Sequence, residues 1–234
     1  MNKIKPEILE NFATKFRVEN GLSQTEPVVL KSLLQKLNIL TVFRPLSDNF
    51  YGLSLRSKDN KRFMLINKNR TMGRQNFTIA HELFHLFFED DLTPRICNKE
   101  SVNHPSEINA NYFACAFLIP KEGLLKELSN EEIQLKNLSL AKIIYLEQYY
   151  SVSRTSILIR LKQLGFISQK LFDDYKSLPV KESARQYGYD TSLYEKSSGN
   201  LIIGSYGEKA KLLFDLDKIS EGHYQEIINT IYNE

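Results

Sequence analysis

Apolar residues recur three and four positions apart in several separate stretches of the chain, the spacing of one helix face. These stretches cover residues 8–16, 29–37, 76–89, 106–119, 140–150, 157–164, 207–216 and 221–232. Residues 183–199 are polar, with serines and glycines, and we expect a long loop there. The pattern therefore predicts a chain that is mainly helical after residue 76.

Three short stretches before residue 70 predict strands. Residues 39–43 are β-branched and aromatic, and residues 62–67 are apolar on both faces, as in a central strand. Residues 51–56 alternate between apolar and polar, which predicts a strand with one wet face or an edge strand. We expect an α+β fold in which a small, mostly antiparallel sheet packs on the helices at 76–89 and 106–119. The predicted units are residues 1–128, which hold the sheet, and a helical region at 129–234, with terminal helices within 207–232.

Composition excludes several classes of protein. The chain has 234 residues, of which 42% are hydrophobic and 25% charged, as in ordinary globular proteins. A net charge of +3 is too small to indicate nucleic acid or an acidic membrane as the partner. The longest apolar run, 113–119, is far below the ~18 residues of a membrane helix, and the polar first ten residues have no signal-peptide core. Two cysteines alone, Cys97 and Cys115, favour reduced thiols in a cytoplasmic protein.

One motif carries chemistry: His81, Glu82 and His85 form an HExxH sequence inside the helix at 76–89. Histidines four residues apart share a helix face and lie ~6 Å apart along the axis. Both rings can therefore reach one zinc ion at ~2.0–2.1 Å. Glu82 would lie beside the metal and take a proton from zinc-bound water as general base. The alternative is a histidine pair that is satisfied by hydrogen bonds on an amphipathic helix.

A catalytic zinc ion needs a third protein ligand and an open fourth position. The compact arrangement HExxHxxGxxH would use Asp91, but Phe88 stands where that arrangement requires glycine, so it is excluded. Glu107 lies 22 residues after the second histidine, at the start of the next apolar helix, and we choose it as the ligand. His104 and Cys97 are weaker substitutes. Taken alone, Glu107 would better fit the role of an acid at a helix N-terminus, where the dipole favours it.

Polar residues near these positions have candidate roles as well. Asn111 follows Glu107 by four residues and shares its face, so it could accept a hydrogen bond from a ligand histidine; otherwise it is a surface residue. Glu89, Asp90 and Asp91 place acids at a helix C-terminus, where the dipole disfavours them. They indicate contact with the metal site or the substrate, or else a solvated loop.

Two segments together resemble a known family. Residues 77–85, FTIAHELFH, resemble the F-T-x-A-H-E-x-x-H core of the ImmA/IrrE family of zinc metallopeptidases, although Phe84 stands where glycine is usual. Residues 107–120 resemble that family's E-x-x-A-N-x-F-A…L-x-P helix. The resemblance implies a zincin-like catalytic unit, Zn²⁺ as cofactor and Glu107 as the third ligand. It also implies a cytoplasmic protease with few substrates, because several members cleave a helix-turn-helix repressor that controls mobile elements or stress responses.

The implied reaction is hydrolysis of a peptide bond in a protein substrate, with Glu82 as general base. We expect the substrate to extend along an edge strand of the sheet formed by Tyr51, Gly52, Leu53, Ser54 and Leu55. Arg74, His104 and Tyr112 are candidates for stabilising the oxyanion, and the sequence does not choose among them.

Two alternatives come from other classes of protein. Residues 138–168 resemble a helix-turn-helix, with Ser153 as N-cap and Arg154, Arg160 and Lys162 expected to be exposed. Because the basic residues are few, direct binding to nucleic acid is not favoured, and these helices are expected to pack on the catalytic unit or to grip a repressor. In the other alternative, zinc is structural in a regulatory protein and has a fourth protein ligand, Cys97 or His104.

Overall fold

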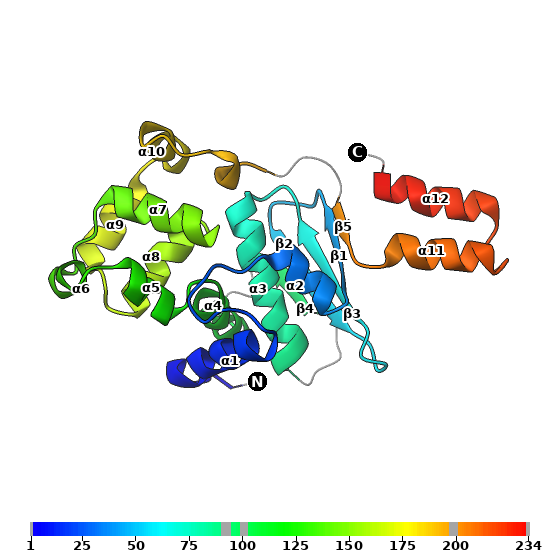
Figure 1. Cartoon of the computed structure of the whole chain (residues 1–234), viewed down its shortest axis with the longest axis horizontal. Helices are drawn as coiled ribbons and strands as arrows, with labels where there is room; N and C mark the ends of the chain where they lie inside the picture. The colour runs from blue at the N-terminus through cyan, green and yellow to red at the C-terminus, as the bar shows by residue number, and fades with distance from the viewer. Residues whose placement is uncertain (1, 90–94, 99–102, 197–200, 233–234) are drawn as a thin grey trace.

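A mixed sheet of five strands forms the frame of the described chain (Figure 1). The computed structural model describes residues 2–89, 95–98, 103–196 and 201–232. The strands are β1 (Ile39–Arg44), β2 (Phe50–Arg56), β3 (Arg62–Asn67), β4 (Arg95–Asn98) and β5 (Leu201–Ile203), in the order β4-β2-β3-β1-β5. β1 runs parallel to β3 and every other pair is antiparallel. The predicted α+β fold with a mostly antiparallel sheet is therefore confirmed.

β2 is not an edge strand, which corrects the role expected for residues 51–55. It pairs with β3 on one side and with β4 on the other. Within the described residues, β4 and β5 form the two edges. The prediction failed because β4 has only four residues and joins the sheet from beyond the following helix, so no local pattern marks it.

Helices cover one face of the sheet in successive layers (Figure 1). α3 packs against β2 and β3, α4 packs on α3, and α1 and α8 both pack on α4. The helices are α1 (Pro6–Glu19), α2 (Leu30–Lys36), α3 (Met72–Phe88), α4 (Pro105–Leu118), α5 (Lys121–Glu127), α6 (Asn130–Leu135), α7 (Leu140–Tyr150), α8 (Arg154–Gln163), α9 (Gln169–Ser177), α10 (Val180–Gln186), α11 (Tyr206–Asp215) and α12 (Glu221–Tyr232).

α3 begins four residues earlier than the apolar pattern predicted. Its first turn is polar, yet it packs tightly, because a Cβ on Gly73 would lie 2.8 Å from the backbone nitrogen of Ser153. α4 has Pro105 in its first turn, where proline is tolerated, and ends before Pro120 as predicted. The two helices that carry the candidate metal ligands are thus clearly bounded.

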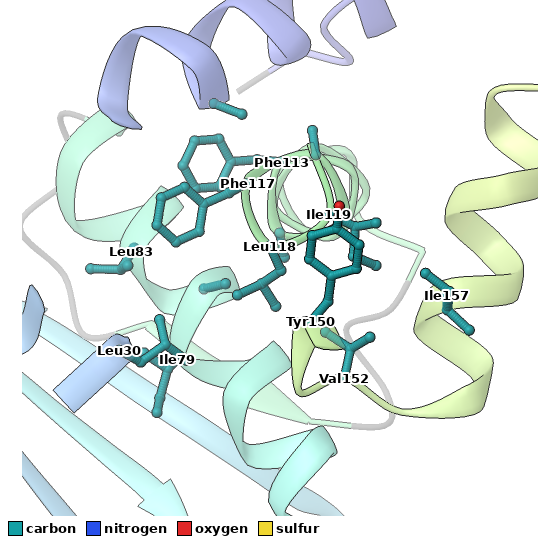
Figure 2. Packing of buried hydrophobic residues seen from close by; sticks show 14 of the residues in the cluster. Leu30, Ile79, Leu83, Phe113, Phe117, Leu118, Ile119, Tyr150, Val152 and Ile157 are labelled. Atoms are coloured by element: carbon teal, nitrogen blue, oxygen red, sulfur yellow. The ribbon is translucent and has the colours of Figure 1, made fainter. Parts of the chain in front are cut away.

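Aromatic and aliphatic side chains fill the space between these layers (Figure 2). The rings of Phe113 and Phe117 on α4 stack with centroids 5.7 Å apart, and Phe84 on α3 lies 5.6 Å from Phe113. Truncating a buried phenylalanine such as Phe113 to alanine would cost about 3–5 kcal/mol. The same buried cluster continues to Ile157 on α8. The boundary at residue 128 stays a prediction, and both sides of it share one core.

The chain after α8 differs in part from the expected arrangement. The predicted loop at 183–199 overlaps the end of α10 and holds a 3-10 turn, Ser192–Tyr194. Glu195 then accepts a backbone hydrogen bond from Met72 at 2.9 Å, so this segment returns to the start of α3. α11 and α12 pair with each other and extend beyond β5 (Figure 1). None of the helices described here has both the length and the apolar character needed to span a bilayer.

α7 and α8 form the predicted pair of helices, but two of its three basic residues are buried, which corrects the expectation of an exposed basic face. Arg154 forms an ion pair with Glu147. Arg160 pairs with Glu10 of α1 and is wholly buried. Of the three, Lys162 alone is exposed. These two guanidinium groups are paired inside the protein and are therefore not available to contact phosphates.

Candidate metal centre

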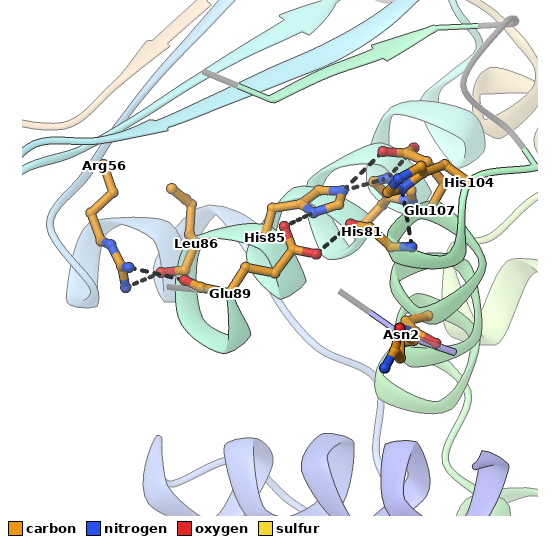
Figure 3. Close-up of polar contacts among 10 residues, drawn as sticks. Asn2, Arg56, His81, His85, Leu86, Glu89, His104 and Glu107 are labelled. Carbon is orange, nitrogen blue, oxygen red and sulfur yellow. Dashed lines mark hydrogen bonds and ion pairs between the residues drawn. The ribbon is translucent and has the colours of Figure 1, made fainter. Parts of the chain in front are cut away.

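His81 and His85 on α3 and Glu107 on α4 turn their side chains toward one another (Figure 3). The two Nε2 atoms are 3.1 Å apart. One oxygen of Glu107 lies 3.2 Å from Nε2 of His81, and the other lies 3.5 Å from Nε2 of His85. All three residues are buried. The structure thus brings together the three ligands expected from the sequence.

Hydrogen bonds fix the orientation of both rings. Nδ1 of His81 lies 3.0 Å from Oδ1 of Asn111, and Nδ1 of His85 lies 2.9 Å from Oε2 of Glu89. Because both oxygens are acceptors, each Nδ1 carries a proton, and in the neutral rings each Nε2 presents a lone pair. Two such lone pairs 3.1 Å apart, with a carboxylate beside them, favour a proton or a metal ion between them. This arrangement therefore fits a metal ion held by two histidines and a glutamate, a donor set that zinc takes in proteins.

The electrostatics of the cluster lead to the same conclusion. Burial alone would lower the pKa of His81, but Cys97, Glu107 and Glu82 together raise that pKa well above its usual value. Burial opposes ionisation of Glu107, yet the two histidines lower its pKa overall. Without a metal ion, the cluster therefore favours a protonated His81 beside an ionised Glu107.

The sequence left two alternatives for Glu89, contact with the metal site or substrate and a solvated loop. The structure shows contact with the metal site, through His85. Besides this contact, the carboxylate of Glu89 accepts a hydrogen bond from the hydroxyl of Ser106. Arg56 of β2 donates to the backbone oxygens of Leu86 and Glu89, at 3.4 and 2.9 Å, and so holds the C-terminus of α3 (Figure 3). Asp90 and Asp91 lie outside the described residues.

Glu82 is fully buried beside this cluster. Neither oxygen of its carboxylate has a partner at full hydrogen-bond geometry among the described residues, although the hydroxyl of Ser54 is close enough to lower its pKa. Burial raises the pKa of Glu82, and the nearby His81 and His85 act against that shift. Gly52 makes the room for it, because a Cβ there would lie 2.9 Å from Oε1 of Glu82. A buried carboxylate of this kind is costly unless a polar partner is bound next to it in the working protein.

A cavity of about 430 Å³ opens beside the cluster. Its walls come from α3, α4, the strands β2 and β4, and α8, and they include the metal-ligand candidates His81 and Glu107. Thr155, Ile159 and Gln163 of α8 also line it. Sequence reasoning missed these three, because nothing in the local pattern of α8 shows that it faces the motif helix. The second helix of the predicted pair therefore forms a wall of the site.

The three oxyanion candidates are placed differently. The exposed Arg74 lines the cavity. His104 is the N-cap of α4, where its Nδ1 accepts a hydrogen bond from the backbone nitrogen of Ser106 at 3.3 Å. The hydroxyl of Tyr112 donates to Glu10 at 3.0 Å, and burial with that carboxylate raises the pKa of Tyr112 to about 12. His104 and Tyr112 are not among the residues that line the cavity, so of the three the structure brings Arg74 alone to the site.

Cys97, expected as a weaker substitute ligand, lies close to the cluster without being part of it. Its Sγ forms a second group with His81 and Glu82, in which the candidate ligand atoms lie within 4.8 Å of one another. Burial raises the pKa of its thiol. Cys115 lines the same cavity from α4 and is also a free thiol.

The chain is similar to one family model and to a solved structure, but to no curated protein sequence. Among solved structures, a Mycobacterium tuberculosis transcriptional regulator is similar, with 22% sequence identity and a TM-score of 0.46. That match covers 68% of this chain and 47% of the regulator, so the chain spans about half the length of that protein. The model of a peptidase family described as the IrrE N-terminal-like domain matches residues 34–162, which is more than half of the chain and holds every metal-ligand candidate. The chain therefore belongs to the family of IrrE N-terminal-like domains.

Proposed function

We propose that this protein is a cytoplasmic zinc-dependent metalloendopeptidase that cleaves a peptide bond in a specific protein substrate, a helix-turn-helix repressor. The observation that carries the proposal is the convergence of His81, His85 and Glu107 beside the buried carboxylate of Glu82, which has no partner at full hydrogen-bond geometry among the described residues. A metal site that served structure alone would have no use for a free base at this position.

Several residues of the chain have separate roles in the proposed hydrolysis. Zinc, when bound, supplies Lewis-acid chemistry that activates water and polarises the scissile carbonyl. Glu82 takes the proton of the attacking water and passes it to the leaving nitrogen. Asn111 and Glu89 keep the two imidazole rings in one tautomer and orientation. Arg74 lines the cavity with an exposed guanidinium group and can donate hydrogen bonds to the carbonyl oxygen.

The shape of the site favours a protein substrate. The cavity is lined mainly by apolar surface, including Phe77 and Ile159, and it can take one large side chain next to the reacting bond. A repressor as the substrate class rests on the family resemblance.

The test is a single substitution, Glu82→Gln, which keeps the shape of the side chain and removes the base. The parental protein and the variant are analysed for bound zinc and are co-expressed with the repressor encoded beside the gene. We expect both to bind zinc and the parental protein alone to remove the intact repressor. Glu131→Gln, at an exposed position on α6, is the matched control and should cleave normally. Cleavage at the parental rate by a zinc-loaded Glu82→Gln protein would refute the proposal.

A further inference from the structure

The fourth position on the metal decides whether the site is open. Zinc takes four donors in tetrahedral geometry, and His81, His85 and Glu107 supply three of them. In a catalytic site water takes the fourth position, whereas a fourth protein ligand closes the site. The question is therefore which donor of this chain lies on the same side as Glu82, where the water must be.

The pairing of β4 with β2 aims Cys97 at that side. Cys97 is the register partner of Gly52, and partners across an antiparallel pair project from the same face of the sheet. The face at Gly52 is turned toward α3, because a Cβ there would meet Thr78 at 2.6 Å and Glu82 at 2.9 Å. The register shifts between Phe50 and Gly52, next to this pair, but the burial of Cys97 and its place in the same cavity wall as His81 show that its side chain faces the motif helix.

The distances agree with this direction. Sγ of Cys97, a ring nitrogen of His81 and a carboxylate oxygen of Glu82 lie within 4.8 Å of one another. Ligands of one tetrahedral zinc ion at ~2.0–2.3 Å are roughly 3.5 Å apart, so the sulfur, which shares His81 with the three ligand candidates, has to move toward the metal position to join them. Cys97 is 8% exposed and lines the cavity, which leaves it room to rotate.

Glu82 provides an independent indication that a group binds between these residues. It is fully buried and neither of its carboxylate oxygens has a partner at full hydrogen-bond geometry among the described residues. The space between Glu82, His81 and Cys97 is therefore a place where a water molecule or a metal-bound ligand belongs.

We infer that Cys97 binds the metal ion as its fourth ligand in the resting protein and so holds the peptidase inactive. The inference rests on the proposed function. With zinc bound, the thiol of Cys97 would release its proton to solvent, and the thiolate would take the position of the water molecule, which would leave through the cavity. Because one position cannot hold both, hydrolysis begins only when the side chain of Cys97 rotates away and water returns. A substrate that enters the cavity, which Cys97 lines, would displace it.

Cobalt substitution tests the inference through a signal that does not depend on activity. Co²⁺ bound to a thiolate has an intense near-ultraviolet charge-transfer band, and Co²⁺ bound to nitrogen and oxygen alone lacks it. The parental protein, Cys97→Ser, Cys97→Ala and Cys115→Ala are loaded with Co²⁺ alone and compared. Cys115→Ala is the matched control, because Cys115 is a buried thiol that lines the same cavity and belongs to neither group of candidate ligands.

We expect the band in the parental protein and in Cys115→Ala, and its loss in both Cys97 variants. Zinc affinity should fall at least about tenfold in Cys97→Ala, since partners outside the ligand set already contribute that much. Peptidase activity of Cys97→Ala without any activating treatment should exceed that of the parental protein. Stoichiometric Co²⁺ without the band in the parental protein would overturn the inference and leave the proposed function intact. Failure of the parental protein to bind Co²⁺ or zinc would overturn both.

Discussion

The buried contact between Glu89 and His85 should contribute measurably to zinc affinity. The carboxylate accepts from Nδ1 of the ring at 2.9 Å, and both side chains are almost inaccessible to solvent. Glu89→Gln keeps an acceptor oxygen and removes the charge, whereas Glu89→Ala removes the acceptor as well. Both variants leave the three ligand candidates in place, so any loss of affinity reports on the orientation and basicity of His85.

The expected loss of zinc affinity follows from the burial of this contact and from the charge of Glu89. Partners of ligand histidines typically contribute 10- to 100-fold to metal affinity, which is about 1.4–2.7 kcal/mol. Because the contact is buried, solvent screens it little and the charge counts in full. We therefore expect a loss of about tenfold for Glu89→Gln and about 100-fold for Glu89→Ala. Asn111→Asp should act in the opposite direction, because it gives His81 the carboxylate that His85 already has.

The assay is competition for zinc against a chromophoric chelator at a fixed pH, with circular dichroism as the check on folding. The order of affinity should be Asn111→Asp, parental, Glu89→Gln, Glu89→Ala. If a folded Glu89→Ala protein bound zinc as tightly as the parental protein, His85 would not be a ligand held in place by Glu89. The account of the site given above would then be wrong.

Three further predictions concern stability and pH. Gly52→Ala places a Cβ 2.6 Å from a methyl group of α3, so urea unfolding should show a loss of about 1–3 kcal/mol together with reduced peptidase activity. Arg160→Met removes the cationic partner of the partly buried carboxylate of Glu10, which keeps the hydrogen bond from Tyr112, and should cost about 3 kcal/mol; adding Glu10→Gln in a double-mutant cycle should recover part of it. Burial acts against ionisation of both His81 and Glu107, yet acidic neighbours raise the pKa of His81 and histidines lower the pKa of Glu107. Without zinc, the pairing of His81 with Glu107 should therefore stabilise the fold most between about pH 4.5 and 6.5. Zinc needs neutral imidazole, so the rise in melting temperature on adding zinc should grow from about pH 5.5 to about pH 8, and a constant rise would contradict this reasoning.

The two histidine candidates could be predicted from the sequence because their geometry is local: residues four apart share a face of any α-helix. Glu107 lies on the next helix, and its choice rested on spacing and on the family resemblance, since the packing of α4 on α3 is a tertiary contact. The first turn of α3 was not predicted because most of its residues are not apolar. Its packing against the turn before α8 holds it in place.

The short strands and the burial of Arg160 could not be predicted, because they depend on contacts between distant parts of the chain. β4 and β5 have four and three residues, and they exist because a partner strand is present, not because of their own pattern. Arg160 looks like an exposed base on an amphipathic helix, and its burial is decided by Glu10, 150 residues away. Glu89 breaks the preference of a helix C-terminus for basic groups, and the structure gives the reason in its bond to His85.

α8 offers a way to separate substrate recognition from catalysis. Ile159 lines the cavity from α8 and belongs to neither group of candidate ligand atoms. If the cavity takes a large apolar side chain of the substrate, that contact contributes about 1.5–3 kcal/mol, or roughly 10- to 100-fold in kcat/KM. Ile159→Lys should therefore lower kcat/KM by about that factor while zinc affinity stays unchanged, and Lys162→Ala, an exposed position on the same helix, should cleave normally. Unchanged cleavage by a folded Ile159→Lys protein would show that the substrate reaches the metal by another route and that α8 has no part in choosing it.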